Sequence, residues 1–98
     1  MKAPDDCKNM SELRNEIDAL DEKLVALLAI RESYIDRAIV LKPKEGIPPQ
    51  APDRVAAVLS KVEGLAEKQG LSKDLAVKLW KVMIDYFIEK EDRAFGNK

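Results

Sequence analysis

Apolar residues recur at steps of three and four along the chain from Met10 to Lys42. This spacing is typical of an α-helix with one buried face, and neither glycine nor proline interrupts the stretch. The pattern predicts one long helix over residues 10–42, with Asn9 as its N-cap and Glu12 placed to complete a capping box. We call the apolar row on this helix the seam, which comprises Met10, Leu13, Ile17, Leu20, Leu24, Leu27, Tyr34, Ala38 and Leu41.

A proline-rich stretch separates this helix from the rest of the chain. Residues 43–52 contain four prolines and a glycine, which cannot continue a helix and predict a stiff, extended loop. Pro52 suits the first turn of a second helix that ends at Gly70, and Ser72 caps a third helix. With an irregular arm at residues 1–8 and no strand pattern, the sequence predicts one all-α domain of three helices over residues 1–98.

The first predicted helix is long for a chain of 98 residues. At about 1.5 Å per residue it extends about 50 Å, more than a compact domain of this mass can cover. An apolar seam left in water is an association site. We therefore expect a second copy of the chain to cover it, giving a helical homodimer.

Composition limits the classes of function. Although 36% of the residues are charged, the net charge is −1, so neither a nucleic-acid footprint nor a polybasic membrane surface is expected. One cysteine and no histidine argue against an internal disulfide and against a metal site. The chain start lacks the apolar run of a signal peptide, and no stretch is apolar enough to span a membrane. We expect a cytoplasmic protein.

Charged residues occupy positions where the periodicity predicts burial. Arg31 fills a position in the seam, and Lys42 lies nearly on the same side of the helix. In the third helix, an apolar row that includes Phe87 extends to Glu91. Arg14 lies beside the seam, about 100° from Arg31 on a straight helix. One chain's two arginines should therefore not face the same pocket, although Arg14 could face the pocket of a partner.

Each of these residues also has an ordinary explanation. Arg31 could extend its head into water or pair with an acid across a dimer interface. Lys42 suits the negative end of a helix dipole, and Glu91 could be solvated near the chain end. Taken together, however, Arg14, Arg31, Lys42, Arg54 and Glu91 could line one cavity, and four cations with one acid suit a small dianion.

The chain resembles the all-helical class of chorismate mutases and their relative, isochorismate-pyruvate lyase. The resemblance covers nearly the whole chain. It rests on Leu13-Arg14, the run IDALDEKLVALLA over residues 17–29, Arg31, Lys42, Asp53-Arg54 and the third helix. It implies an intertwined homodimer with two equivalent active sites, acting on chorismate or isochorismate without a cofactor.

The resemblance also implies roles for the charged residues. Arg31 and the partner chain's Arg14 would each bind one carboxylate of the substrate. Lys42 would contact the ether oxygen side, and Arg54 would support the polar edge. Glu91 falls where the family places a Gln or Glu that hydrogen-bonds the ether oxygen, a role that requires it to be protonated. Burial favours the neutral form and neighbouring cations favour the charged form, so the sequence leaves this open.

Three positions depart from the mutase pattern. Where mutases usually place acids that bind the ring hydroxyl, this chain has Ala51 and Val55, and Phe87 replaces a small polar residue. Together with the opening MKAPDDC and the run APDRVAA over residues 51–57, these differences resemble the lyase, which releases salicylate and pyruvate from isochorismate.

The mutase, which rearranges chorismate to prephenate, ranks slightly above the lyase. The loop between Lys42 and Arg54 has the mutase length, and the arginine contacts to the carboxylates can support that reaction alone. A third possibility is a non-catalytic dimeric interaction module whose pocket is filled by Phe87. The retained cations argue against it, because an empty pocket has no reason to keep them buried.

Overall fold

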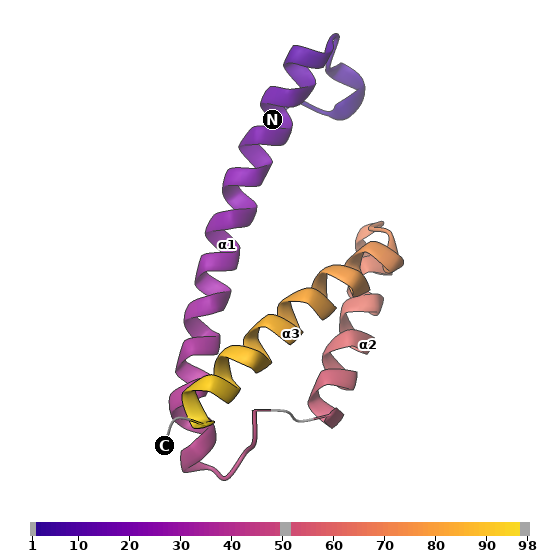
Figure 1. The fold of residues 1–98 in the computed structure, drawn as a ribbon. Coiled ribbons are helices and arrows are strands. Elements are labelled where there is room, and N and C mark those ends of the chain that lie inside the picture. Colours follow the sequence, from indigo (N-terminus) through magenta and orange to yellow (C-terminus); the bar gives the residue numbers. More distant parts are fainter. Residues whose placement is uncertain (1, 50–51, 97–98) are drawn as a thin grey trace. The chain divides into compact units, whose positions relative to one another are not determined.

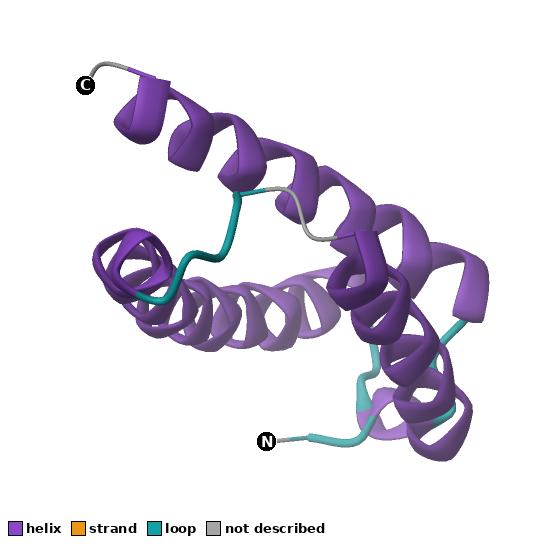
Figure 2. Ribbon diagram, turned by 90° about the horizontal axis from the view of Figure 1, so that it is seen from below, coloured by secondary structure: helices purple, strands orange, loops and turns teal. Residues whose placement is uncertain are grey.

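The computed structural model describes residues 2–49 and 52–96, and all of its regular structure there is helical. The elements in chain order are a 3-10 turn at Pro4–Asp6 and the helices α1 (Met10–Lys44), α2 (Pro52–Gln69) and α3 (Lys73–Gly96) (Figure 1). Figure 2 draws no strand in the described residues. The predicted class, all-α with three helices of which the first is long, is confirmed. None of the described helices is both long and apolar enough to cross a membrane.

The chain divides into two compact units, Met1–Asp36 and Arg37–Lys98. The first unit contains the arm and most of α1. The second contains the last turns of α1, the loop, α2 and α3. The expectation of one domain over residues 1–98 stays a prediction.

The start of α1 carries the predicted cap. The Asn9 side-chain oxygen accepts a hydrogen bond from the Glu12 N–H at 2.9 Å, and the Asn9 carbonyl accepts one from the Leu13 N–H at 3.1 Å. The Glu12 carboxylate also turns back, but it accepts from the Lys8 N–H at 3.5 Å and from the Lys2 ammonium at 2.9 Å. Asn9 is confirmed as N-cap, while the reciprocal bond reaches one residue further back than a capping box requires.

The arm before α1 is more regular than the sequence indicates. Pro4–Asp6 forms a single 3-10 turn, closed by hydrogen bonds from the Asp6 N–H to the Ala3 carbonyl and from the Cys7 N–H to the Pro4 carbonyl. The expectation of an irregular arm is wrong at these three residues. The reason is that proline, with its fixed φ and missing N–H, suits the first position of a helical turn.

The ion pair between Lys2 and Glu12 gives a first testable prediction. The hydrogen bond from Lys2 lowers the pKa of Glu12, the Lys8 N–H acts in the same direction, and the same ion pair raises the pKa of Lys2. Because the folded pKa of Glu12 lies below its unfolded value, the stability it contributes is present at neutral pH and is lost as the pH falls through the folded pKa. A carbon-13 NMR titration of the Glu12 carboxyl should give a midpoint below 4.5, its ordinary value. In Lys2→Gln the midpoint should rise towards that value, and an unchanged midpoint would contradict the assignment.

Hydrogen bonds at the end of α1 hold the backbone carbonyl of Lys42 in place. The helix continues to Lys44, two residues beyond the predicted end, with Pro43 inside its last turn. A proline removes one N–H, but here the last turn is closed by a glycine-terminated motif instead. Gly46 has a φ of 70° and donates to the Pro43 carbonyl at 3.3 Å, while the Ile47 N–H donates to the Lys42 carbonyl at 2.9 Å. Gly70, with a φ of 75°, ends α2 in the same way.

Helices α2 and α3 pack side by side and form the core of the second unit (Figure 1). Val62, Ala66 and Ala76 are buried between them, and Val58 and Trp80 pack against this group. Three buried side chains make a small core, and two of them are alanines that allow the helix axes to approach closely.

The two apolar rows predicted on α3 differ in burial. The row that runs through Trp80, Met83 and Phe87 is half-buried and ends at Glu91, which is buried. The other row stays exposed in the single chain; it comprises Leu75, Leu79, Val82 and Tyr86. The half-buried row therefore places Glu91 in the interior of the second unit.

Candidate active site

Lys42 and Glu91 form an ion pair in the second unit. The Lys42 Nζ lies 2.7 Å from Oε2 of Glu91 and donates a hydrogen bond to it. The Glu91 side chain is 4% exposed and that of Lys42 is 25% exposed. A carboxylate with so little contact with water requires a partner, and Lys42 supplies it. The explanation of Glu91 as a solvated position is therefore wrong, because the half-buried row of α3 carries it inward.

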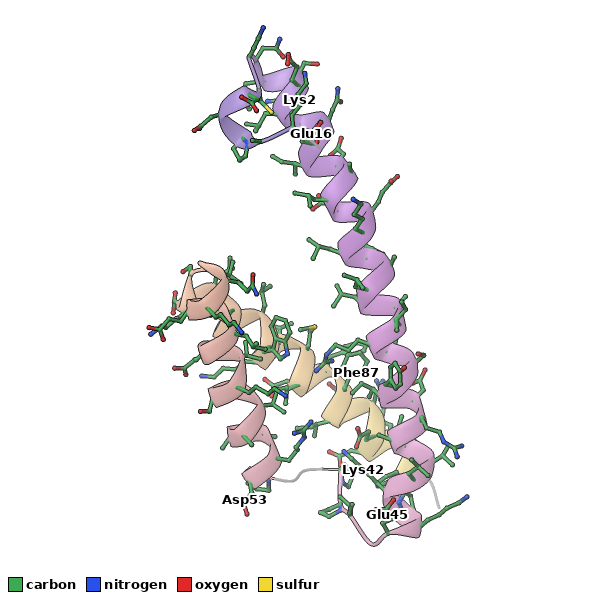
Figure 3. All side chains as sticks on the ribbon, turned by 180° about the vertical axis from the view of Figure 1, so that it is seen from behind. Lys2, Glu16, Lys42, Glu45, Asp53 and Phe87 are labelled. Carbon is green, nitrogen blue, oxygen red and sulfur yellow. The ribbon has the colours of Figure 1, made fainter. Side chains whose placement is uncertain are left out.

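The ammonium of Lys42 also reaches the loop. Its Nζ lies 3.5 Å from the backbone carbonyl oxygen of Pro49. No residue pattern indicates this contact in advance, because a backbone carbonyl carries no side-chain signal. Lys42, which Figure 3 labels on the last turn of α1, thus joins three segments: α1, the end of the described part of the loop, and α3.

Arg31 carries a buried donor without a partner. Its side chain is half-buried, and its Nη1 is buried with no hydrogen-bond partner among the described residues. Extending into water is therefore excluded for this nitrogen in the single chain, and so is pairing with an acid of the described part of the same chain. An unsatisfied buried donor costs about 1–3 kcal/mol. An anion supplied from outside the chain would remove that penalty.

Arg14 and Arg54 are exposed and lie at helix starts. Arg14 lies 17 positions before Arg31 on α1, which corresponds to about 25 Å along a helix axis. The two arginines of one chain are thus too far apart to bind the same small molecule. Arg54 follows Asp53, which Figure 3 labels at the start of α2. The roles expected for Arg14, Arg31 and Arg54 stay predictions.

Apolar side chains occupy two positions where a ring hydroxyl would need a polar partner. Val55 is half-buried in the first turn of α2. Phe87, labelled in Figure 3, is half-buried on α3 and packs edge-on against Tyr86, with ring centroids 5.1 Å apart. Phe87 lies one helical turn before Glu91 and so shares its face of α3. Ala51, the third position expected to differ, lies outside the described residues.

A surface hollow on α1 is not a candidate site for binding a small dianion. It is lined by Asp18, Asp21, Glu22 and Val25. Three carboxylates in one shallow, open site would repel a dianion. None of the cations expected from the sequence lines it.

The described residues form three helices, with an ammonium–carboxylate pair buried in the second unit, and they define an all-helical protein. The chain belongs to the chorismate mutase type II family, whose model matches residues 13–92. It is 34% identical over 91 residues to the isochorismate pyruvate lyase of Pseudomonas aeruginosa, covering 93% of this chain and 89% of that protein. It is 31% identical over 89 residues to the 4-amino-4-deoxychorismate mutase of Streptomyces venezuelae, covering 91% of this chain and 86% of that protein. With the chorismate mutase of Methanocaldococcus jannaschii it shares 24% identity over 79 residues, 81% of this chain and 80% of that protein.

Proposed function

We propose that this protein is a chorismate mutase that rearranges chorismate to prephenate without a cofactor. Arg31 and the partner chain's Arg14 bind the two carboxylates of the substrate. Lys42 donates to the ether oxygen, and Arg54 supports the polar edge of the ring. Family membership over residues 13–92 supports this proposal, since all of these residues lie within the matched range.

The chemistry asks two things of these residues. The ether C–O bond breaks while a new C–C bond forms, so the substrate must be held in a compact conformer, and paired contacts to both carboxylates provide that orientation. Negative charge grows on the ether oxygen in the transition state. A donor already fixed in place stabilises that charge without reorganisation, and the ammonium of Lys42 is such a donor.

The observation that carries the proposal is the buried, unpartnered Nη1 of Arg31. Arginine is the side chain best suited to bind a carboxylate through two parallel hydrogen bonds. An arginine whose buried Nη1 keeps a free donor in the single chain is therefore ready for a carboxylate.

A second candidate function is the isochorismate-pyruvate lyase reaction. Two observations favour it: the 34% identity to the lyase of Pseudomonas aeruginosa over 93% of this chain, and the apolar side chains Val55 and Phe87. The lyase would use the same contacts to the two carboxylates and would transfer a hydrogen within isochorismate, releasing salicylate and pyruvate. The two reactions need the same pocket and differ in the placement of the ring hydroxyl.

A homodimer is part of the proposal. The α1 helix has no buried residue among those described, and seam residues stay exposed in the single chain: Leu24 by 55%, Leu27 by 63% and Tyr34 by 73%. Burying a large apolar side chain from full exposure is worth about 1.5–3 kcal/mol, so covering these partly exposed side chains contributes a part of that amount for each. A second copy that covers the seam would also bring its own Arg14 to the first chain's site.

The test is a direct assay of the purified protein with chorismate and with isochorismate, following prephenate, salicylate and pyruvate. We expect prephenate from chorismate and slow or no turnover of isochorismate. Efficient release of salicylate and pyruvate, with little prephenate, would replace the mutase by the lyase. Turnover of neither, without thermal stabilisation by either dianion, would leave the non-catalytic interaction module.

A further inference from the structure

In the structure Glu91 contacts Lys42, a pairing that the family resemblance does not imply. The resemblance assigns Glu91 to the ether oxygen of the substrate, as a protonated donor. In the structure its Oε2 instead accepts the hydrogen bond of the Lys42 ammonium at 2.7 Å. The question is therefore whether Glu91 acts on the ligand or through the lysine.

The donors of Lys42 are divided among different partners. An ammonium has three N–H donors and no acceptor. One is directed at Glu91 and one at the Pro49 carbonyl oxygen, 3.5 Å away. The third donor has no partner among the described residues. A cation that contacts two oxygens on different segments has one remaining direction in which to bind a ligand oxygen.

A lysine needs such anchoring if it is to act as a fixed donor. Its side chain carries about 2 kcal/mol of rotamer entropy, which an unanchored ammonium keeps until the ligand arrives. The Glu91 carboxylate comes from α3, is 4% exposed, and lies on the half-buried row whose Trp80 packs against the core between α2 and α3. It is thus a rigid reference point for a flexible side chain at the end of α1.

We propose that Glu91 is a positioning residue, whose carboxylate acts through Lys42 by holding the ammonium with one donor turned towards the ligand. The inference rests on the proposed function, because the ligand oxygen that Lys42 meets is the ether oxygen of that reaction. It changes the role of Glu91 from a proton-bearing contact of the substrate to the partner that fixes the contact.

A double-mutant cycle separates the two roles. Lys42→Met should lower kcat about 100- to 1,000-fold, because it removes the donor to the growing charge. Glu91→Leu should lower kcat about 10- to 100-fold with less effect on KM, because it misplaces that donor. In the Lys42→Met background, Glu91→Leu should lower kcat by less than about 3-fold, since there is no ammonium left to position. An equal loss from Glu91→Leu in both backgrounds would overturn the proposal.

Two controls keep the cycle interpretable. Glu89→Leu places the same substitution at an exposed position of α3, two residues before Glu91, and should leave kcat unchanged. Lys42→Met leaves a buried carboxylate without its cation and could impair folding. A second cycle uses Lys42→Gln and Glu91→Gln, whose side chains are neutral and still form hydrogen bonds, so neither variant leaves a buried charge when the two are combined. The losses of kcat in this cycle should also be non-additive.

A measurement without substrate distinguishes failure of this inference from failure of the proposed function. NMR relaxation of the Lys42 terminal methylene should show a rigid side chain in the unmodified protein and in Glu89→Leu, and a mobile one in Glu91→Leu. A methylene that stays rigid in Glu91→Leu would overturn the positioning role whatever the protein catalyses. If rigidity is lost but neither dianion is turned over, the proposed reaction fails and Glu91 still positions Lys42.

Discussion

Replacing Arg31 with alanine is expected to lower kcat/KM by roughly 30- to 5,000-fold while the oligomeric state stays unchanged. Truncating one side of a desolvated, charge-assisted contact costs about 2–5 kcal/mol. The Nη1 of Arg31 is buried and has no partner in the described part of the chain, so a substrate carboxylate would be bound there with little competition from water. Steady-state kinetics with chorismate, together with sedimentation of the variant, check this result.

The matched control for Arg31→Ala is Arg37→Ala. Arg37 is an exposed cation on the same helix, six residues further on, and its removal should leave kcat/KM within about 2-fold. Arg31→Lys should give an intermediate loss, because lysine keeps the charge but cannot present two parallel donors. A near-normal rate for Arg31→Ala would mean that the carboxylate contacts lie elsewhere.

Much of the fold could be predicted because its signals are local. The step of three and four residues gives α1, Asn9 gives its start, and Gly70 gives the end of α2 through a backbone conformation that favours glycine. The errors also have local causes. Pro43 was expected to lie beyond the helix. The last turn tolerates it because the N–H groups of Gly46 and Ile47 donate hydrogen bonds to the last carbonyls of the helix.

The site was less predictable because it depends on contacts that are distant in sequence. Periodicity could place Glu91 on an apolar row, but it could not show that this row is the half-buried one of the two. It also could not show that Glu91 pairs with Lys42, which is 49 residues away. The contact of Lys42 with the Pro49 carbonyl has no sequence signal at all. Arg31 illustrates the opposite case, since a cation in an apolar seam already indicated an unusual residue.

The exposed seam leads to the prediction that tests the dimer and the shared site together. Arg14→Ala and Arg31→Ala homodimers should both be nearly inactive, because every site lacks one arginine. In a mixed dimer of the two variants, one site lacks both arginines and the other has both, if each site takes Arg14 from one chain and Arg31 from the other. Mixed dimers purified with two different tags should therefore recover about half of the wild-type activity per dimer.

The mixed dimer discriminates between the possible arrangements without any structure of the complex. If each site took both arginines from one chain, every site of the mixed dimer would still lack one, and no activity would return. The distance of about 25 Å between Arg14 and Arg31 along α1 argues against that arrangement. Adding Leu24→Glu to both variants places a charge in the seam, where Leu24 is 55% exposed in the single chain, and should abolish pairing and recovery together. Ala26→Glu, on an exposed part of α1 away from the seam, should leave both intact.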